Sequence, residues 1–246
     1  ELTAAEEELK EQNYKLEQSR NELSHLAYHD YLTSLPNRLS LKEYLDQALL
    51  TAGKSQYALF FIDTDNFKYI NDSLGHSTGD QLLVMIGNRL SENITSNGTL
   101  FRFGGDEFII IVQDASEFDL MAQADKLIKA FKEPFELNYS ILHISISIGI
   151  TTYPEAGDRV DDLIRSGDIA MYHAKSRGKG QYVLFTQSMD YSIQERLSIE
   201  NHLRTALERK EFLLYYQPQV DIATGTISGF EALLRWASPE LGFVMP

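Results

Sequence analysis

Phe101-Arg102-Phe103-Gly104-Gly105-Asp106-Glu107-Phe108 interrupts an apolar segment that extends from Leu100 to Val112. Two apolar runs separated by paired glycines predict a β-hairpin with a tight tip. Gly104 and Gly105 have no Cβ atom, so a bulky ligand can approach the backbone closely there. Two adjacent carboxylates follow this bare backbone directly. The stretch therefore predicts a metal–phosphate site at the tip of the hairpin.

The composition bounds the class of protein. The chain has 246 residues, 43% apolar and 24% charged, which suits a soluble globular protein of one full domain plus extra segments. It has no apolar run of about 20 residues that could span a bilayer, and its first residue, Glu1, indicates a fragment. The lack of cysteine excludes disulfides and thiolate zinc sites and fits a cytoplasmic protein. A net charge of −14 argues against a nucleic-acid partner.

Residues 1–29 predict a signalling helix. They contain neither Gly nor Pro, and leucine recurs every seven residues at Leu2, Leu9, Leu16 and Leu23. The intervening core positions are Ala5, Gln12, Ser19 and Leu26. This heptad pattern favours a parallel dimeric coiled coil, because so polar a helix has little face for burial against its own domain. The alternative is a single amphipathic helix that lies on its own domain.

The middle of the chain alternates helical and strand patterns. Asn37 is a good N-cap for a helix that runs to about Leu50, and the apolar run 57–63 predicts a central strand buried on both faces. Further helices are expected at 66–74, 78–94, 117–131 and 161–176. Clean alternation over 141–151 predicts a strand with one covered and one more polar face, and a short strand is expected at 182–185. These elements predict an α/β (α+β) fold with a central mixed, mostly antiparallel sheet flanked by helices.

Acidic residues fall at the ends of these strands. Asp63 ends the buried strand, Asp65 follows it, and Asp106 and Glu107 lie at the hairpin tip. If the hairpin pairs beside the buried strand, these acids converge at one edge of the sheet. Such oxygens suit Mg²⁺, which takes one or two carboxylates and completes its shell with phosphates and water. The alternatives are a helix N-cap for Asp65 and an ordinary loop acid for Asp63.

Two further groups of polar residues are candidates for nucleotide contacts. Asn71 and Asp80 could read the edge of a base, although Ser77-x-x-Asp80 also resembles a capping box. His76 is more typical of a loop histidine bonded to the backbone. The candidate phosphate partners are Arg102, Lys175, Arg177 and Lys179. The last three also end a helix, where cations are favoured by the helix dipole.

Taken together, the motifs resemble those of the GGDEF family of diguanylate cyclases over about residues 28–186. They occur in one order and spacing as Asp30-x-Leu-Thr-x-Leu-x-Asn-Arg38, Asp63-Thr-Asp-Asn-Phe-Lys68, Asn71-Asp72, Gly75-His76, Gly79-Asp80, Gly104-Gly-Asp-Glu-Phe108, Ser147-Ile-Gly149 and Ala174-Lys175. The resemblance implies a fold akin to nucleotide cyclase and polymerase palm domains. It also implies a homodimer in which two protomers, joined through the N-terminal helix, each bind one GTP and face each other. The 3′-OH of each GTP then attacks the α-phosphorus of the other, which releases pyrophosphate and forms cyclic di-GMP.

The resemblance also implies a role for each matching residue. Mg²⁺ (or Mn²⁺) would be held by Asp63, the Thr64 carbonyl and Asp106. Asp106 would be the candidate base, with Glu107 beside it, and the division of metal and proton roles between the two stays open. Guanine would be bound by Asn71 and Asp80, with His76 bracing their loop. Phosphates would be contacted by Lys68, Arg102, Lys175 and Lys179, with the backbone of Gly104 and Gly105 against the nucleotide.

Two positions depart from the family pattern. Family members with product inhibition carry Arg-x-x-Asp shortly before the signature, and Thr95-Ser-Asn-Gly98 stands there in this chain. We therefore expect no high-affinity inhibitory site for cyclic di-GMP at that position. Lys179 stands where arginine is commoner, which keeps the charge but loses the bidentate fork.

The last part of the chain changes in character. A charged helix is expected at 189–210, with strands at 212–220 and 227–236 around a turn at Thr224-Gly225. Tyr216-Gln-Pro-Gln219 and Gly229-Phe-Glu231-Ala-Leu-Leu-Arg-Trp236 resemble the opening of an EAL phosphodiesterase domain, a TIM-type barrel in which Glu231 would be a metal ligand. A barrel of that kind takes about 250 residues, so this part alone cannot hydrolyse cyclic di-GMP. We expect its apolar strands to be mobile, swapped or docked on the neighbouring domain.

The expected domains are therefore a signalling coiled coil at 1–29, a GGDEF domain at 30–187, and a linker helix with the truncated start of an EAL domain at 188–246. The main hypothesis is an active cyclase. The alternative is a catalytically weak GTP-binding domain that regulates the EAL partner, and a purely structural adaptor explains the acidic and basic residues poorly. Upstream segments could anchor the intact protein to a membrane.

Overall fold

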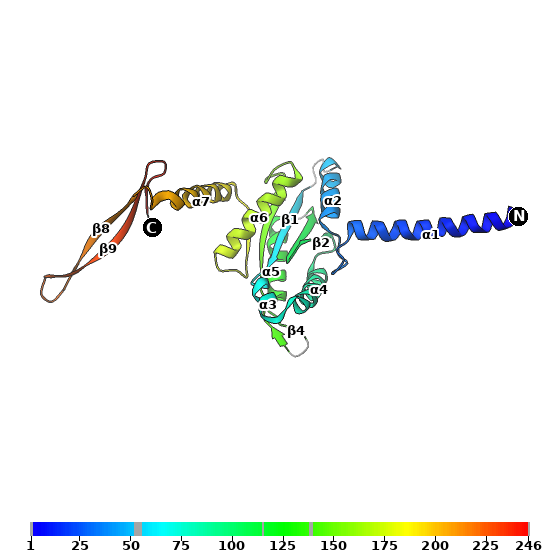
Figure 1. Cartoon of the computed structure of the whole chain (residues 1–246), viewed down its shortest axis with the longest axis horizontal. Coiled ribbons are helices and arrows are strands. Elements are labelled where there is room, and N and C mark those ends of the chain that lie inside the picture. Colours follow the sequence, from blue (N-terminus) through cyan, green and yellow to red (C-terminus); the bar gives the residue numbers. More distant parts are fainter. Residues whose placement is uncertain (1, 52–55, 115, 138–139, 246) are drawn as a thin grey trace. The chain divides into compact units, whose positions relative to one another are not determined.

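The computed structural model describes residues 2–51, 56–114, 116–137 and 140–245 (Figure 1). The chain divides into two compact units, Glu1–Met189 and Asp190–Pro246, and each is described by itself. No helix in the described part of the chain is long and apolar enough to cross a membrane.

The first unit is built on a five-stranded sheet. Its strands, in spatial order, are β2 (Gly98–Gly104), β3 (Glu107–Gln113), β1 (Tyr57–Thr64), β6 (Ile146–Tyr153) and β7 (Tyr182–Leu184). The β6–β7 pair is parallel, and the other neighbours in this sheet are antiparallel. The predicted α/β class with a mixed, mostly antiparallel sheet flanked by helices is therefore confirmed (Figure 1).

Helices cover both faces of this sheet, and β1 is buried along its whole length as predicted. Its alternate side chains enter two cores, Phe60 and Ile62 on one face and Leu59 and Phe61 on the other. The first core is closed by α3 (Phe67–Leu74), α4 (His76–Asn93) and α5 (Glu117–Ala130). The second core is closed by α2 (Arg38–Thr51) and α6 (Val160–Ser176). A central strand with no polar face is what this two-sided cover requires.

Two helix starts follow directly from local sequence. Asn37 caps α2 as predicted, because its Oδ1 accepts the backbone N–H groups of Leu39 at 2.9 Å and Ser40 at 3.1 Å. Ser116 opens α5 with a capping box in which Ser116 and Asp119 each bond the backbone of the other. Both caps satisfy N–H groups that a helix otherwise leaves without a partner.

The predicted N-terminal helix is α1 (Leu2–Tyr28). Three leucines of its heptad seam, Leu16, Leu23 and Leu26, are between 64% and 68% exposed. An apolar stripe this exposed along one helix is what a coiled coil would cover. The dimer itself stays a prediction.

The predicted strand over 141–151 is wrong in two respects. The segment divides into β5 (Ser140–Leu142), which pairs with β4 (Phe135–Leu137) in a separate ribbon, and β6. The expected polar face of β6 is also buried, since Ser147 and Thr151 are fully covered. Their hydroxyls donate to Asp65 Oδ1 at 2.7 Å and to the Leu163 carbonyl at 3.4 Å, so short polar side chains fit beneath a helix.

The α4 helix begins earlier than predicted. It starts at His76 and follows α3 after Gly75, whose φ of +84° suits a residue without a side chain. Ser77 therefore lies within the first turn, so the capping-box interpretation of Asp80 is wrong.

The second unit holds most of α7 (Gln187–Ala206) and a three-stranded antiparallel sheet. The strands are β8 (Phe212–Val220), β9 (Ile227–Ser238) and β10 (Gly242–Val244), in the order β10-β9-β8. β10 was not predicted. The buried Trp236 indole donates to Glu211 Oε2 at 2.8 Å, which ties β9 to the residue that precedes β8. Apolar side chains such as Tyr216 and Phe230 stay more than 60% exposed on this sheet.

The packing of α6 on the sheet depends on two glycines. A Cβ atom on Gly149 of β6 would overlap the Gly167 carbonyl and the Met171 amide of α6. A Cβ atom on Gly167 would in turn lie 3.2 Å from the Cβ atom of Phe61. This close approach of backbone to backbone sets the height of α6 above β1 and β6.

We therefore expect Gly149→Ala to destabilise the first unit by about 2–4 kcal/mol, because both clashing groups are backbone atoms that cannot rotate away. Urea unfolding followed by circular dichroism measures this loss. Trp236 is the only tryptophan and lies in the second unit, so its fluorescence is an internal reference that should not change. Gly229→Ala is the matched control, since a Cβ atom there has an ordinary neighbour at 3.6 Å. Equal stability of wild type and Gly149→Ala would contradict this account.

A candidate metal and phosphate site at the end of β1

The hairpin tip presents open backbone next to carboxylates. β2 and β3 pair with an irregularity between Arg102 and Gly104, and Gly105 has a φ of +53°. Among the described atoms, none lies within 4 Å of where a Cβ atom of Gly104 or Gly105 would stand, neighbours in the chain apart. A large group can therefore contact this backbone directly.

The sheet register brings the predicted acids together. Asp63 is the Cα partner of Glu107 across the β1–β3 pair. The Thr64 amide and hydroxyl both donate to the Asp106 carbonyl at 3.3 Å, which holds the tip against the end of β1. Asp63 is 7% exposed and Thr64 1% exposed. The predicted convergence of strand and hairpin therefore occurs.

The convergence has an electrostatic cost. Burial, and to a smaller extent the charges of Asp106 and Asp65, raise the pKa of Asp63 to about 6, against the opposing effect of Lys175. Burial also raises the pKa of Glu107, and the charges of Asp63, Asp168 and Asp106 add to that shift. The pKa of Asp106 is likewise raised, mainly by burial. Carboxylates in this condition favour a bound cation.

Lys175, one of the predicted phosphate partners, supplies such a cation. It lies in the last turn of α6, and its Nζ is 2.7 Å from Asp63 Oδ2. Its side chain is 32% exposed, so one side of the ammonium stays open to solvent. Lys175 can therefore bind an anion beside the strand end without leaving its place on α6.

The carboxylates fit a magnesium ion that arrives with its phosphates. Within the described residues, no group of three or more His, Cys, Asp or Glu side chains could hold a metal ion by itself. Magnesium needs only one or two carboxylates when water and phosphate oxygens supply the rest. Asp63 and Asp106, with the Thr64 carbonyl, offer that smaller set, and their mutual repulsion is the charge that a divalent ion would neutralise.

The predicted base-reading residues lie on α3 and α4. The Asn71 Oδ1 atom is buried without a hydrogen-bond partner and packs where Gly79 has no side chain. An acceptor left in this state is costly until a donor reaches it. Asp80 and His76 are exposed on α4.

The environment of Arg102 differs from the one expected for a residue that contacts phosphate. It is 8% exposed, and its guanidinium donates to Asp30 Oδ1 at 2.6 Å and to the Gly105 carbonyl at 2.8 Å. Its amide also donates to the Pro36 carbonyl at 2.8 Å. Burial raises the pKa of Asp30, but hydrogen bonds from Thr33 and Arg102 outweigh burial and lower it overall. Arg102 therefore holds the tip against the turn that follows α1.

The other predicted lysines stand on exposed segments. Lys68 is exposed on α3, and Lys179 donates from its Nζ to Asn66 Oδ1 at 2.7 Å. Of the three predicted lysines, Lys175 is the one for which the described contacts include an ion pair with a carboxylate of the site.

Asp65 belongs neither to the open site nor to a helix cap. It is 4% exposed and accepts the hydroxyls of Ser145 at 2.6 Å and Ser147 at 2.7 Å and the Gly180 amide at 3.0 Å. The α3 cap position is Asn66, so the N-cap interpretation of Asp65 is wrong. Asp65 instead ties the end of β1 to the segments that precede β6 and β7.

Asp168 of α6 is a residue that sequence reasoning missed. Its charge acts on Glu107 and is itself influenced by Lys175. Asp168 and Lys175 are seven residues apart, so both lie on one face of α6. That spacing was the available signal.

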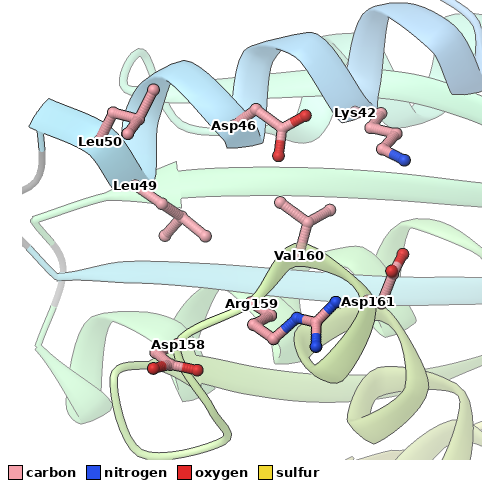
Figure 2. Close-up of a pocket in the computed structure, with 8 residues that line it drawn as sticks. All are labelled: Lys42, Asp46, Leu49, Leu50, Asp158, Arg159, Val160 and Asp161. Carbon is pink, nitrogen blue, oxygen red and sulfur yellow. The ribbon is translucent and has the colours of Figure 1, made fainter.

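A cavity of about 480 Å³ lies elsewhere in the first unit, and Figure 2 shows residues that line it. Leu49 of α2 and Val160 of α6 point toward each other across it. Val160 begins α6 and Lys175 lies near its end, about 22 Å further along at 1.5 Å per residue. The cavity is therefore remote from the carboxylates, which stand at an open edge of the sheet.

The end of β1 thus brings together carboxylates, open glycine backbone and a lysine. The chain matches the family model described as "Diguanylate cyclase, GGDEF domain" over residues 27–181, and that described as "EAL domain" over residues 200–246. The chain belongs to the GGDEF family.

Two relatives have names that refer to cyclic di-GMP metabolism. The chain is 40% identical over 233 residues to the "Bifunctional diguanylate cyclase/cyclic di-GMP phosphodiesterase MucR" of Pseudomonas aeruginosa. The aligned residues cover 94% of this chain and 34% of the relative. It is 36% identical over 221 residues to the "Cyclic di-GMP phosphodiesterase PdeR" of Escherichia coli. That alignment covers 90% of this chain and 33% of the relative. The chain thus spans about a third of the length of these relatives.

Among solved structures, the chain resembles a GGDEF domain of PA1120 (TpbB or YfiN) from Pseudomonas aeruginosa. The identity is 39% and the TM-score 0.65, over 68% of this chain and 99% of the other. The coiled coil and GGDEF domain of DgcB from Caulobacter crescentus match with a TM-score of 0.63 over 73% of this chain and 98% of the other. At 23% identity, that likeness shows the fold alone.

The raised pKa of Asp63 predicts a pH-dependent stability without metal. Because its pKa in the folded protein, about 6, exceeds its ordinary value of 3.8, the stability gained from protonated Asp63 is complete below pH 3.8 and is lost as the pH rises through 6. Asp63→Asn removes this loss. We therefore expect the free energy of unfolding of the variant, relative to wild type, to rise by about 1–2 kcal/mol between pH 4 and pH 7.

Urea unfolding in a chelating buffer at a series of pH values measures the difference between variant and wild type. Asp46→Asn, which changes an exposed aspartate of α2, is the matched control and should follow wild type at every pH. A difference between Asp63→Asn and wild type that does not change between pH 4 and pH 7 would contradict the assignment.

Proposed function

We propose that this chain is a Mg²⁺-dependent diguanylate cyclase that condenses two GTP molecules into cyclic di-GMP and pyrophosphate. The observation that carries the proposal is the pairing of Asp63 with Glu107, which places β1 and the hairpin acids at one open strand end. Membership of the GGDEF family supports it. Phosphoryl transfer needs positioning and charge neutralisation more than a protein nucleophile, and this site offers both.

The residues divide into three tasks. Asp63, the Thr64 carbonyl and Asp106 would hold the metal ion, which when bound neutralises phosphate charge and favours ionisation of a hydroxyl. Asp106, with Glu107 beside it, would accept the proton of the attacking 3′-OH, because a raised pKa suits a general base. Lys175 would exchange its bond to Asp63 for one to a phosphate.

Nucleobase and phosphate contacts complete the substrate site. The Asn71 side chain would turn away from Gly79 so that its Oδ1 accepts an N–H of guanine, and Asp80 and His76 would line the same end of α4. Lys68 and Lys179 are exposed and would contact phosphates, whereas Arg102 would position the Gly104–Gly105 backbone.

The open geometry suits half of a shared site. One GTP bound at this edge would present its 3′-OH outward, where a second protomer with its own GTP must face it. The exposed leucine seam of α1 would join two such protomers.

A second candidate function is regulation of an EAL partner by GTP binding. The EAL match at residues 200–246 favours it, as does the name of the relative PdeR, a phosphodiesterase. This function would need GTP binding but little turnover.

Incubation of the purified chain with GTP and Mg²⁺, with chromatographic detection of cyclic di-GMP, separates the two functions. We expect product from the wild type and a loss of at least about 10³-fold in Asp106→Asn, which loses both a metal ligand and the candidate base. Asp46→Asn is an aspartate-to-asparagine control remote from the site and should keep full activity.

Full turnover by Asp106→Asn would show that the site is misassigned. Micromolar GTP binding without product, in a sample that is dimeric by light scattering, would favour the regulatory function.

The position of the absent Arg-x-x-Asp motif generates a separate prediction. The structure has a cavity of about 300 Å³ there, lined by residues that include Thr95, Asn97, Asp114, Asp119 and Gln123. No lysine or arginine is among the described lining residues, so this cavity has no cation for a dianionic dinucleotide. We expect no binding of cyclic di-GMP below about 10 µM at this surface by calorimetry. Tight binding that survives mutation of Asp63 but not of Asn97 would overturn this expectation.

A further inference from the structure

The last turn of α1 carries two histidines at the spacing of metal-binding helices. His25 and His29 are four residues apart, and the His29 amide donates to the His25 carbonyl at 2.9 Å, so both side chains lie on one face. Their rings are stacked, with centroids 4.2 Å apart and an interplanar angle of 3°. Pairs of histidines at this spacing bind zinc on helices.

The two rings are held differently. His25 is exposed, whereas His29 is partly buried and its Nδ1 atom is covered without a hydrogen-bond partner. The His29 ring is therefore held by packing and not by a hydrogen bond at Nδ1. Because this nitrogen is covered, an ion would bind the ring through its other nitrogen, Nε2.

We propose that His25 and His29 form a binding site for a borderline transition-metal ion of the Zn²⁺, Ni²⁺ or Cu²⁺ type. Imidazole is the ligand that these ions share, and Mg²⁺ prefers oxygen. Two nitrogens on a tetrahedral zinc ion lie about 3.4 Å apart when each bond is about 2.0–2.1 Å. Imidazole lone pairs lie in the plane of the ring, so the exposed His25 ring would have to turn out of the parallel stack to share an ion with His29.

The site would have two protein ligands and water in its other positions. No described group of three or more histidines and carboxylates is arranged to hold a metal, so we expect moderate affinity. Leu26 follows His25, where zinc peptidases with this histidine spacing carry glutamate, so the site has no general base for hydrolysis.

The place of the pair gives metal binding a mechanical consequence. The end of α1 is bonded to the start of α2, because Asn37 donates from Nδ2 to the Ala27 carbonyl at 2.7 Å. His29 also forms a β-bridge with Pro36, whose carbonyl accepts the Arg102 amide. An ion across His25 and His29 would therefore fasten the last turn of α1 to the segment that holds the hairpin.

Calorimetric titration of the full chain with Ni²⁺, in millimolar Mg²⁺ to occupy the carboxylates, tests the site. We expect one Ni²⁺ per chain and a higher melting temperature, because a ligand that binds only the folded state stabilises it. His25→Gln should weaken binding by more than the about 10–100-fold that loss of an outer-shell partner costs, because it removes one of the two protein ligands. His25 is exposed, so this variant should keep the fold, and His29→Gln should behave in the same way where circular dichroism shows it folded.

His143→Gln is the matched control, because it removes an exposed histidine elsewhere and should bind Ni²⁺ as the wild type does. Absence of binding by the wild type, or equal affinity of wild type and His25→Gln, would show that the stack is packing only. The readout is metal binding without GTP, so its failure leaves the cyclase proposal untouched.

Discussion

The site depends on one register, the antiparallel pairing of β1 with β3 that sets Asp63 opposite Glu107. Because side chains alternate along a strand, a slip by one residue would send Asp63 to the other face of the sheet. Burial of β1 on both faces prevents such a slip, since alternate residues of the strand fill two different cores. The cores therefore do more than stabilise the domain, because their packing fixes which carboxylates meet.

The same register explains the electrostatics of the strand end. The ladder buries Asp63 and holds it near Asp106, and burial first, then the charge of Asp106, raise the pKa of Asp63. Lys175 opposes this rise from the end of α6, and the position of α6 is set in turn by the contact of Gly149 with Gly167. A backbone contact in the core thus determines the distance between a lysine and an aspartate at the site. The repulsion that remains between these carboxylates is what a divalent metal ion would neutralise.

Much of the fold could be predicted because its signals are local. The paired glycines, the apolar run of β1 and the Asn37 cap each depend on neighbouring residues, and all three occur in the structure. The errors concern contacts between distant segments. Ser147 looked like part of a polar face, but it bonds Asp65, which lies 82 residues earlier in the chain.

The placement of the site residues could be predicted in part. The convergence of Asp63 with the hairpin acids was expected on the condition that the hairpin pairs beside β1, which it does, whereas the environment of Arg102 was not expected. Its ion pair with Asp30 spans 72 residues, and no local pattern marks a buried partner at that separation. Asp168 was missed because its effect on Glu107 depends on where α6 crosses the sheet.

Arg102 also suggests how a helix at the start of the chain can influence a site at the end of β1. Its guanidinium joins Asp30, two residues after α1, to the carbonyl of Gly105 at the tip. A guanidinium is rigid and almost fully buried here, so displacement of one partner must move the other or leave a buried charge unpaired. Rotation of α1 would therefore reach the glycine backbone through one side chain. This path is short because the turn after α1, the end of β2 and the hairpin tip meet at the same edge of the sheet.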